Sequence, residues 1–268
     1  MSGAIGGTQL LRELRELGVT EGGVLLVQAS MRRLGPVRGG ARTVVQALRR
    51  ALGPTGTLVA YTGTPENSLS SRAHREATAG LDGEALERYL AAMPAFDPAT
   101  TPSSPTMGAL SEEVRRTRGA LRSSHPQCSF AAVGPEAARI TAVHPRSCHL
   151  GEESPIGRLY ELGASALLLG IPSWLLSPYH LADCRQPEPP TQLYRCRVAG
   201  QDGTAEWAEF EGIRFDDRHF PELGTAVRQS VKFGEGWVGA AECFLVPVAP
   251  AVDAADRWLR ERRNFPPH

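Results

Sequence analysis

Residues 164–185 read Ala-Ser-Ala-Leu-Leu-Leu-Gly-Ile-Pro-Ser-Trp-Leu-Leu-Ser-Pro-Tyr-His-Leu-Ala-Asp-Cys-Arg, and this run gives the clearest indication of the architecture. Its first part, 165–169, is a short apolar run typical of a buried strand, and the Gly, Pro and Ser residues after it predict a turn. A helical segment that carries His180 follows. Because ligands in open α/β sheets bind at the carboxyl ends of the strands, His180 is the first catalytic candidate.

The N-terminal part of the chain predicts a βαβ unit. Thr8 can cap a helix that Gly18 ends, and apolar strands are expected at 24–27 and 57–61. Between these strands, the spacing of the apolar residues predicts a helix at 43–52. A strand, a helix and a second strand in this order indicate parallel strands joined by a right-handed crossover.

The rest of the chain departs from this pattern in two places. Residues 63–106 are rich in Pro, Ser, Thr and Gly, so we expect an irregular excursion with one short helix at 83–92. Two alternating runs at 193–198 and 205–210 flank Gly200-Gln-Asp-Gly203, which predicts a hairpin. Further elements are expected as helices at 107–116, 134–143, 155–162, 220–230 and 252–262, as a loop at 121–126, and as a strand at 129–133. Residues 237–246 are expected to form a strand pair or one bent strand around Gly239. The predicted fold class is therefore α/β: a single domain over residues 1–268, with a central mostly parallel sheet flanked by helices and an antiparallel C-terminal extension.

Composition narrows the function classes. The 268 residues carry 29 basic and 29 acidic side chains without a long basic run, which argues against nucleic acid as a partner. The five cysteines are widely spread and form no Cys-x-x-Cys pair, so neither a disulfide framework nor a metal site is indicated. No stretch has the pattern of a signal peptide or a membrane span. We expect a soluble, cytoplasmic monomer or homodimer with no membrane partner.

His180 has two interpretations from the sequence. It can be a helical histidine that packs or caps, with Asp183 solvated on the same helix face at i+3. Alternatively, it can be a general base that works near neutral pH and is oriented by a carboxylate. The carboxylate is expected elsewhere in the chain, and its candidates are Glu222, Asp216 and Asp217, in a polar stretch before a predicted helix.

Other polar residues also keep more than one interpretation. His125 lies in the segment Arg122-Ser-Ser-His-Pro126, which could hold phosphate or pantetheine oxygens or form a plain polar turn. Ser30 follows a strand but lacks the Gly-x-Ser-x-Gly elbow of a nucleophilic serine. Residues 35–40 lack the Gly-Lys-Ser/Thr of a phosphate-binding loop. The remaining histidines lack metal-ligand spacing, and we expect them on the surface. They are His74, His144, His149 and His219.

Several segments between residues 8 and 248 occur in an order that is more specific than any single motif. They are Gly23-Val-Leu-Leu-Val-Gln-Ala-Ser-Met-Arg-Arg-Leu-Gly35, Ala51-Leu-Gly-Pro-Thr-Gly-Thr-Leu-Val59, Phe96-Asp-Pro-Ala-Thr-Thr-Pro102, Met107-Gly-Ala-Leu110, Arg122-Ser-Ser-His-Pro126, Ser129-Phe-Ala-Ala-Val-Gly134, Ser154-Pro-Ile-Gly-Arg-Leu-Tyr-Glu-Leu-Gly163, Leu167-Leu-Leu-Gly170 and His180-Leu-Ala-Asp183. Together they resemble the aminoglycoside 3-N-acetyltransferase family. Two positions depart from the family pattern: Gln28-Ala29-Ser30 stands in place of His-Ser-Ser, and Asp183 stands in place of Glu.

The resemblance implies acetyl transfer from acetyl-coenzyme A to the 3-amino group of the deoxystreptamine ring of an aminoglycoside antibiotic, without a metal. It implies that His180 deprotonates the attacking amine and that Glu222 is its carboxylate helper. Asp183, Asp216 and Asp217 are expected near the polycationic substrate, with the acidic residues of 76–87 and 206–217 lining the cleft. The residues expected to receive coenzyme A are Ser30, Met31, Arg32, Leu34, Gly35, Ser103, Ser104, Met107, Gly108, Arg122, Ser123, His125 and Ser129.

Two other functions stay open at this point. One is a biosynthetic acyltransferase that uses the same chemistry on another amine. The other is a non-catalytic aminoglycoside-binding protein that kept the fold. Loss of turnover with retained ligand binding on replacing His180 separates the enzymes from the binding protein.

Overall fold

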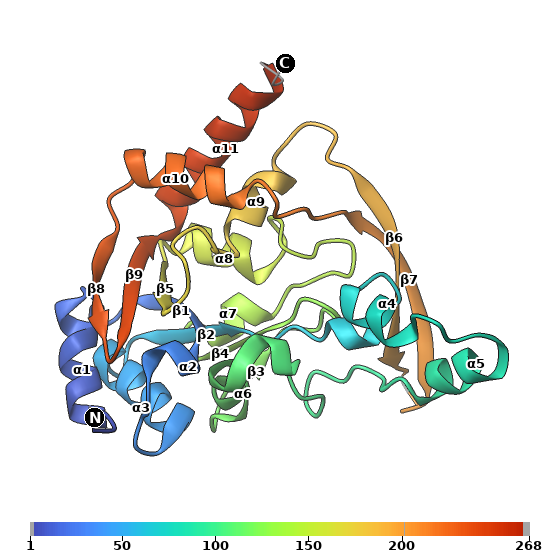
Figure 1. The fold of residues 1–268 in the computed structure, drawn as a ribbon, viewed down its shortest axis with the longest axis horizontal. Helices are drawn as coiled ribbons and strands as arrows, with labels where there is room; N and C mark the ends of the chain where they lie inside the picture. Colours follow the sequence, from blue (N-terminus) through green and yellow to red (C-terminus); the bar gives the residue numbers. More distant parts are fainter. Residues whose placement is uncertain (1–2, 201, 265–268) are drawn as a thin grey trace.

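The computed structural model describes residues 3–200 and 202–264 and contains a seven-stranded sheet in the order β3-β4-β2-β1-β5-β9-β8 (Figure 1). Its strands are β1 (Val24–Ala29), β2 (Thr57–Tyr61), β3 (Leu121–Arg122), β4 (Phe130–Val133), β5 (Ser165–Leu169), β8 (Gly234–Val238) and β9 (Ala241–Pro247). The apolar run at 165–169 is β5, as predicted, and it lies beside β1 near the centre of the sheet.

The centre of the sheet is parallel and its flanks are antiparallel. β1 pairs in parallel with both β2 and β5, whereas β4 and β3 on one side and β9 and β8 on the other pair antiparallel. The predicted α/β class is confirmed, with the parallel part confined to these three central strands. The chain explains the difference, because only Gly239 and Ala240 separate β8 from β9, and a turn this short forces an antiparallel pair.

Helices cover both faces of the sheet. One face is covered by α1 (Gly7–Glu16), α3 (Gly40–Leu52) and α6 (Gly108–Arg116), and the other by α7 (Ala137–Thr141), α8 (Pro155–Glu161), α9 (Tyr179–Cys184), α10 (Phe220–Ser230) and α11 (Val248–Asn264) (Figure 1). Within the described ranges, none of the helices combines the length and the apolar character that a membrane span requires.

The strand β5 shows how the sequence builds two cores at once. Ala166 and Leu168 pack into the core beneath α8 to α11, while Leu167 and Leu169 pack into the core beneath α1, α3 and α6, and all four are fully buried. A strand covered on both faces must be apolar at every position, which is why β5 reads as a continuous apolar run rather than an alternating one.

A two-stranded ribbon of β6 (Thr191–Ala199) and β7 (Ala205–Ile213) stands apart from the main sheet and confirms the predicted hairpin. The irregular excursion at 63–106 lies against this ribbon (Figure 1), and single bridges join Ser68 to Cys196 and Phe96 to Val198. The excursion contains the predicted helix as α5 (Gly83–Ala92), together with α4 (Arg72–Thr78), which the sequence analysis missed.

Two local predictions need correction. The helix expected at 134–143 is reduced to α7, because Gly134 has a φ of 137° and a Cβ there would lie 2.4 Å from the carbonyl oxygen of Gly56. Gly134 and Pro135 therefore form a tight turn after β4 instead of a helix start. The loop expected at 121–126 begins with the two-residue strand β3, which pairs with the edge of β4.

Candidate active site

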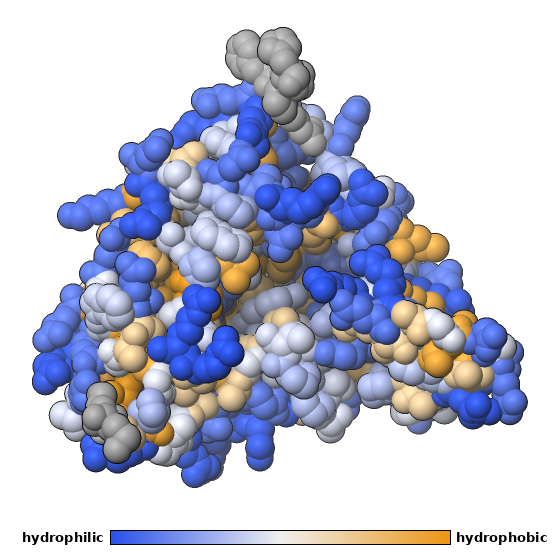
Figure 2. Space-filling model, in the orientation of Figure 1, coloured by the Kyte–Doolittle hydropathy of each residue, from blue (hydrophilic) through white to orange (hydrophobic). Residues whose placement is uncertain are grey.

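The carboxyl ends of β1 and β5 lie side by side and begin the loops that build the site. The N–H of Ser30 donates to the carbonyl of Leu169 (2.8 Å), and the N–H of Ser177 donates to Oε1 of Gln28 (3.2 Å). These bonds hold the loop before α9 against the end of β1, where the short helix α2 (Met31–Leu34) starts. Figure 2 shows that this face of the molecule is hollowed near its centre, between the region of α9 and α10 and the region of α2 and α4.

His180 and Asp183 form a pair on α9. Nδ1 of His180 lies 3.0 Å from Oδ2 of Asp183, and the two side chains are 16% and 17% exposed. Because the carboxylate can only accept, the imidazole proton lies on Nδ1 and leaves the lone pair on Nε2. Among the described residues, no protein group hydrogen-bonds to Nε2 of His180. This nitrogen is therefore available to take a proton from a bound molecule.

Aromatic rings and a second histidine surround the pair. The rings of Phe215 and Phe220 lie 4.7 Å from the His180 ring, centroid to centroid. Burial opposes ionisation of Asp183, but the hydrogen bond from His180, the polar contact of His219 and the charge of these imidazoles outweigh it, so the pKa of Asp183 is lowered. The carboxylate is therefore ionised at neutral pH and can stabilise a proton held by His180.

His219 was expected on the surface, and this expectation is wrong. Its Nε2 lies 3.2 Å from Oδ1 of Asp183, and its ring stacks on Trp258 of α11 with an interplanar angle of 16°. His219 comes immediately before α10, so α9 and α10 both contribute to the surroundings of the carboxylate. The contact between residues 183 and 219 could not be predicted from a local sequence pattern, because the whole ribbon of β6 and β7 lies between them in the chain.

Glu222, the expected carboxylate helper, is engaged elsewhere. It is 63% exposed on α10 and forms an ion pair with Arg262. Asp216 is bound by Arg218, whose hydrogen bonds lower the pKa of Asp216 to about 2 although burial opposes this, and Asp217 is exposed. The carboxylate that contacts His180 in this structure is thus Asp183, which was expected at the substrate, and not Glu222, Asp216 or Asp217.

Two of the loops expected to receive coenzyme A meet at the end of β1. A Cβ on Gly108 would lie 3.7 Å from the carbonyl oxygen of Ala29, which brings the start of α6 next to α2. Besides Arg122, the expected coenzyme A residues that stay at least partly exposed are Ser30, Met31, Arg32, Gly35, Met107 and Gly108. Leu34 is 1% exposed and belongs to the core, so the expectation that its side chain contacts coenzyme A is wrong.

Ser103 and Ser104 hold the excursion in place through their side-chain hydrogen bonds. Both are buried, and the hydroxyl of Ser103 donates to Glu112 (2.9 Å) while that of Ser104 donates to Glu66. Burial opposes ionisation of Glu112, but the hydrogen bonds of Arg115 and Ser103 outweigh it and lower the pKa of Glu112 to about 2. The hydroxyls of Ser103 and Ser104 are therefore already hydrogen-bonded inside the protein, contrary to the expected contact with coenzyme A.

Arg122 also has its donors occupied. Its guanidinium donates to the hydroxyl of Ser129 (3.0 Å) and to the carbonyls of Thr62 (2.6 Å) and Thr101, and it lies over the ring of Phe96. Burial, followed by the charge of a neighbouring arginine, lowers the pKa of Arg122 to about 10. Arg122 and Ser129 thus tie the excursion to the end of β2, and the expectation that their side chains bind coenzyme A is corrected.

His125 lies in a buried cluster with His144 and His149, with ring centroids 4.8 and 4.4 Å from that of His125. Nδ1 of His125 accepts from two backbone N–H groups, and Nε2 donates to the carbonyl of Arg146 (3.1 Å). These bonds fix His125 as a neutral imidazole and leave no atom for a ligand. The hydroxyl of Ser123 bonds to Nδ1 of His144 (2.9 Å), so Ser123 is also structural. The cofactor role expected for His125 and Ser123 is wrong.

Burial of His144 and His149 in this cluster, and of His74 beside Tyr89 on α5, overturns the expectation that these histidines lie on the surface. His74, His144 and His149 are 8%, 4% and 3% exposed, and the ribbon of β6 and β7 covers His149 with Tyr194 and Phe210. Residues far along the chain bury these histidines, which local sequence does not reveal. No three His, Cys, Asp or Glu side chains in the described part of the chain are placed to hold one metal ion.

We expect this cluster to make the protein less stable in mild acid. Burial lowers the pKa of His144 from 6.5 to about 4 and that of His149 from 6.5 to about 3. Below pH 6.5 the unfolded chain therefore binds more protons than the folded chain, so stability is present at neutral pH and is lost as the pH falls. Each histidine that stays neutral in the folded state lowers the free energy of unfolding by up to about 1.4 kcal/mol for every pH unit of acidification in this range.

Urea unfolding of wild type and the His149→Phe variant between pH 7 and pH 4 tests this expectation. A phenyl ring keeps the tilted ring contact with Tyr194 and removes both ring nitrogens, of which Nδ1 has no hydrogen-bond partner and Nε2 contacts Oε1 of Gln127 (3.1 Å). The free energy of unfolding of the variant should depend less steeply on pH than that of wild type. Equal slopes would show that the cluster does not cause the acid sensitivity.

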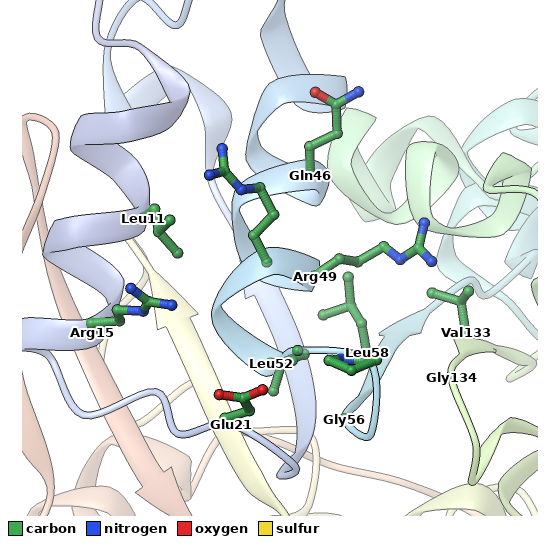
Figure 3. A pocket seen from close by; sticks show the side chains of 13 residues that line it. Leu11, Arg15, Glu21, Gln46, Arg49, Leu52, Gly56, Leu58, Val133 and Gly134 are labelled. Carbon is green, nitrogen blue, oxygen red and sulfur yellow. The ribbon is translucent and has the colours of Figure 1, made fainter.

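A cavity of about 710 Å³ lies at the opposite end of the strands, away from His180. Figure 3 shows Arg15 of α1 and Arg49 of α3 beside it, with Glu21 and Gly56 at its lower edge. Both arginines lie in the last turns of their helices, where a positive side chain offsets the negative end of the helix dipole. We assign these arginines a structural role.

The sequence of this chain is similar to that of a family of known enzymes. A family model described as aminoglycoside 3-N-acetyltransferase matches residues 26–260. An aminoglycoside N(3)-acetyltransferase III from a Salmonella species is 36% identical over 267 residues, which covers 95% of this chain and 91% of the relative.

Solved structures agree over almost the whole chain. The complex of AAC-IIIb with CoASH has a TM-score of 0.83 and 29% identity, and the alignment covers 97% of this chain and 98% of that chain. A room-temperature neutron/X-ray structure of sisomicin-bound AAC-VIa has a TM-score of 0.85 and 28% identity, with 97% and 99% covered. The likeness therefore includes the main sheet, the ribbon and the excursion.

Proposed function

Since this chain belongs to the aminoglycoside 3-N-acetyltransferase family, we propose that it transfers the acetyl group of acetyl-coenzyme A to the 3-amino group of the deoxystreptamine ring of an aminoglycoside. The family makes the chain an acetyltransferase, and the ring position and the residue roles are the proposal. The observation that carries it is the His180–Asp183 pair at the carboxyl ends of β1 and β5, with Nε2 of His180 free to accept a proton.

We assign His180 as the general base. Nε2 removes a proton from the substrate amine while the amine nitrogen attacks the thioester carbonyl, because a protonated amine has no lone pair for the attack. The new C–N bond forms, the C–S bond breaks, and the leaving coenzyme A thiolate takes up the proton that His180 removed from the amine, which returns His180 to its neutral form. Asp183 stabilises the imidazolium and holds the ring in the tautomer that keeps Nε2 unprotonated beforehand.

Coenzyme A is proposed to lie along α2 and the start of α6. The contacts we propose are the partly or fully exposed members of the expected set whose side chains are not already tied up as that of Arg122 is: Ser30, Met31, Arg32, Gly35, Met107 and Gly108. The CoASH complex of a protein with the same fold supports coenzyme A as the co-substrate. The Arg32 guanidinium has no carboxylate partner among the described residues and is our candidate for a phosphate contact.

The amine substrate is proposed to approach from the side of Asp216 and Asp217. A polycation favours an acidic rim, and the sisomicin complex of a related protein supports an aminoglycoside as the substrate. Some of the acidic residues expected to line the cleft are already paired, since Glu84 binds Arg88 and Glu209 binds Arg195. Asp217 is therefore proposed to attract the polycationic substrate more strongly than Glu84 and Glu209 do.

A thiol-release assay with acetyl-coenzyme A and a panel of aminoglycosides tests the proposal. We expect release of free coenzyme A, and NMR of the product should locate one acetyl group on the 3-amino nitrogen. Acetyl groups at another position would contradict the ring assignment. Bound coenzyme A without release for any aminoglycoside would favour another amine, and absence of coenzyme A binding would favour a non-catalytic protein.

A further inference from the structure

Asp183 is held from both sides by imidazole rings. Oδ2 faces Nδ1 of His180 at 3.0 Å, and Oδ1 faces Nε2 of His219 at 3.2 Å. Nε2 of His219 is shielded from solvent, and it has no other polar partner within the described ranges. The contact lies outside ideal hydrogen-bond alignment, as is common in catalytic sites before substrate binds.

The backbone and one aromatic ring fix the position of His219. Its carbonyl accepts the N–H of Leu223 (3.0 Å) in the first turn of α10, and its ring stacks on Trp258. A cavity of about 260 Å³ adjoins Asp183 and His219 and is lined in addition by Arg214, Asp216 and Arg262. These are the charged groups that face the two residues from the segment before α10 and from α11.

We propose that His219 is a positioning residue for the reaction: it holds Oδ1 of Asp183 so that Oδ2 stays aligned with Nδ1 of His180. This inference rests on the proposed function of His180. Without His219, the carboxylate can rotate about its Cβ–Cγ bond and lose its alignment with the imidazole. The donor also keeps Asp183 ionised, so the proton taken from the amine stays on His180 rather than passing to the carboxylate.

The proposal predicts a direction for the pH dependence. A neutral His219 that donates to Asp183 weakens the pull of the carboxylate on a proton at His180, and a protonated His219 repels that proton. Removing the donor therefore favours protonation of His180 in both cases. The acid limb of the profile of kcat/KM should move to higher pH, by about half a unit or more.

Two variants separate this role from simple packing. His219→Phe keeps an aromatic ring on Trp258 but removes the donor, and His219→Gln keeps an N–H donor near the Nε2 position but removes the ring. We expect His219→Phe to lower kcat roughly tenfold to a hundredfold, with KM for acetyl-coenzyme A nearly unchanged and the acid limb shifted. His219→Gln should retain most of kcat and the wild-type profile.

The assays use the full chain, with melting temperature and coenzyme A affinity measured for each variant. Unchanged kcat and profile in His219→Phe, or equal losses in both variants, would overturn the positioning role. Loss in His219→Gln with retention in His219→Phe would assign His219 to stacking alone, which also overturns it. Absence of acetyl transfer by the wild-type protein would instead contradict the proposed function, so the two failures are distinguishable.

Discussion

Replacing His180 by alanine is expected to lower kcat by about 10²- to 10⁴-fold, the usual range for loss of a general base. The side chain is 16% exposed and its Nε2 has no protein partner among the described residues, so its removal leaves the surrounding hydrogen bonds intact apart from the one to Asp183. Affinity for coenzyme A should change little, because the expected coenzyme A residues belong to α2 and the start of α6.

Chemical rescue sharpens this test. Alanine leaves a space next to Phe215 and Phe220 into which free imidazole can bind, and added imidazole should restore part of the lost rate in proportion to its neutral form. Trp174, in the loop before α9, offers a fluorescence signal for ligand binding in the same variant. If the alanine variant turned over at the wild-type rate, His180 would have no part in the proton transfer.

Much of the fold could be predicted because its signals are local. The apolar run at 165–169, the helix at 83–92, the helix at 220–230 and the hairpin all follow from periodicity and turn residues a few positions apart. The direction of the flanking strands was harder to predict, since it depends on how the chain returns to the sheet. Gly134 illustrates the limit, because its turn is imposed by contact with Gly56, which lies far away in the sequence.

In the candidate site too, features that depend on neighbouring residues were easier to predict than contacts between distant segments. The sequence placed His180 and Asp183 on one helix face at i and i+3, but it did not reveal their contact, and the orienting carboxylate was expected at Glu222 instead. Their contact with His219 depends on how α10 packs on α9 and α11, which no local pattern encodes. The buried roles of Arg122 and His125 were missed for the opposite reason: their polar, hydroxyl-rich segment resembles a ligand loop, but the excursion and the ribbon cover it.

Asp183→Asn is expected to lower kcat by about 10²- to 10⁴-fold while preserving the shape of the site. The asparagine amide can donate to Nδ1 of His180, which would place the imidazole proton on Nε2 and remove the lone pair that accepts the proton of the amine. The variant also loses the negative charge that stabilises the imidazolium. KM for both substrates should change less than kcat, because the effect falls on the proton-transfer step.

Glu222→Gln is the matched control, since it makes the same change of carboxylate to amide on α10. Glu222 is 63% exposed and paired with Arg262, so we expect its loss to change kcat less than twofold, as a surface ion pair is worth only about 0.2–1 kcal/mol. A large effect at Glu222 with a small effect at Asp183 would reverse the assignment and make Glu222 the helper in the reacting state. The expected opposite result would show that the carboxylate at i+3 on α9, and not the one on α10, orients His180.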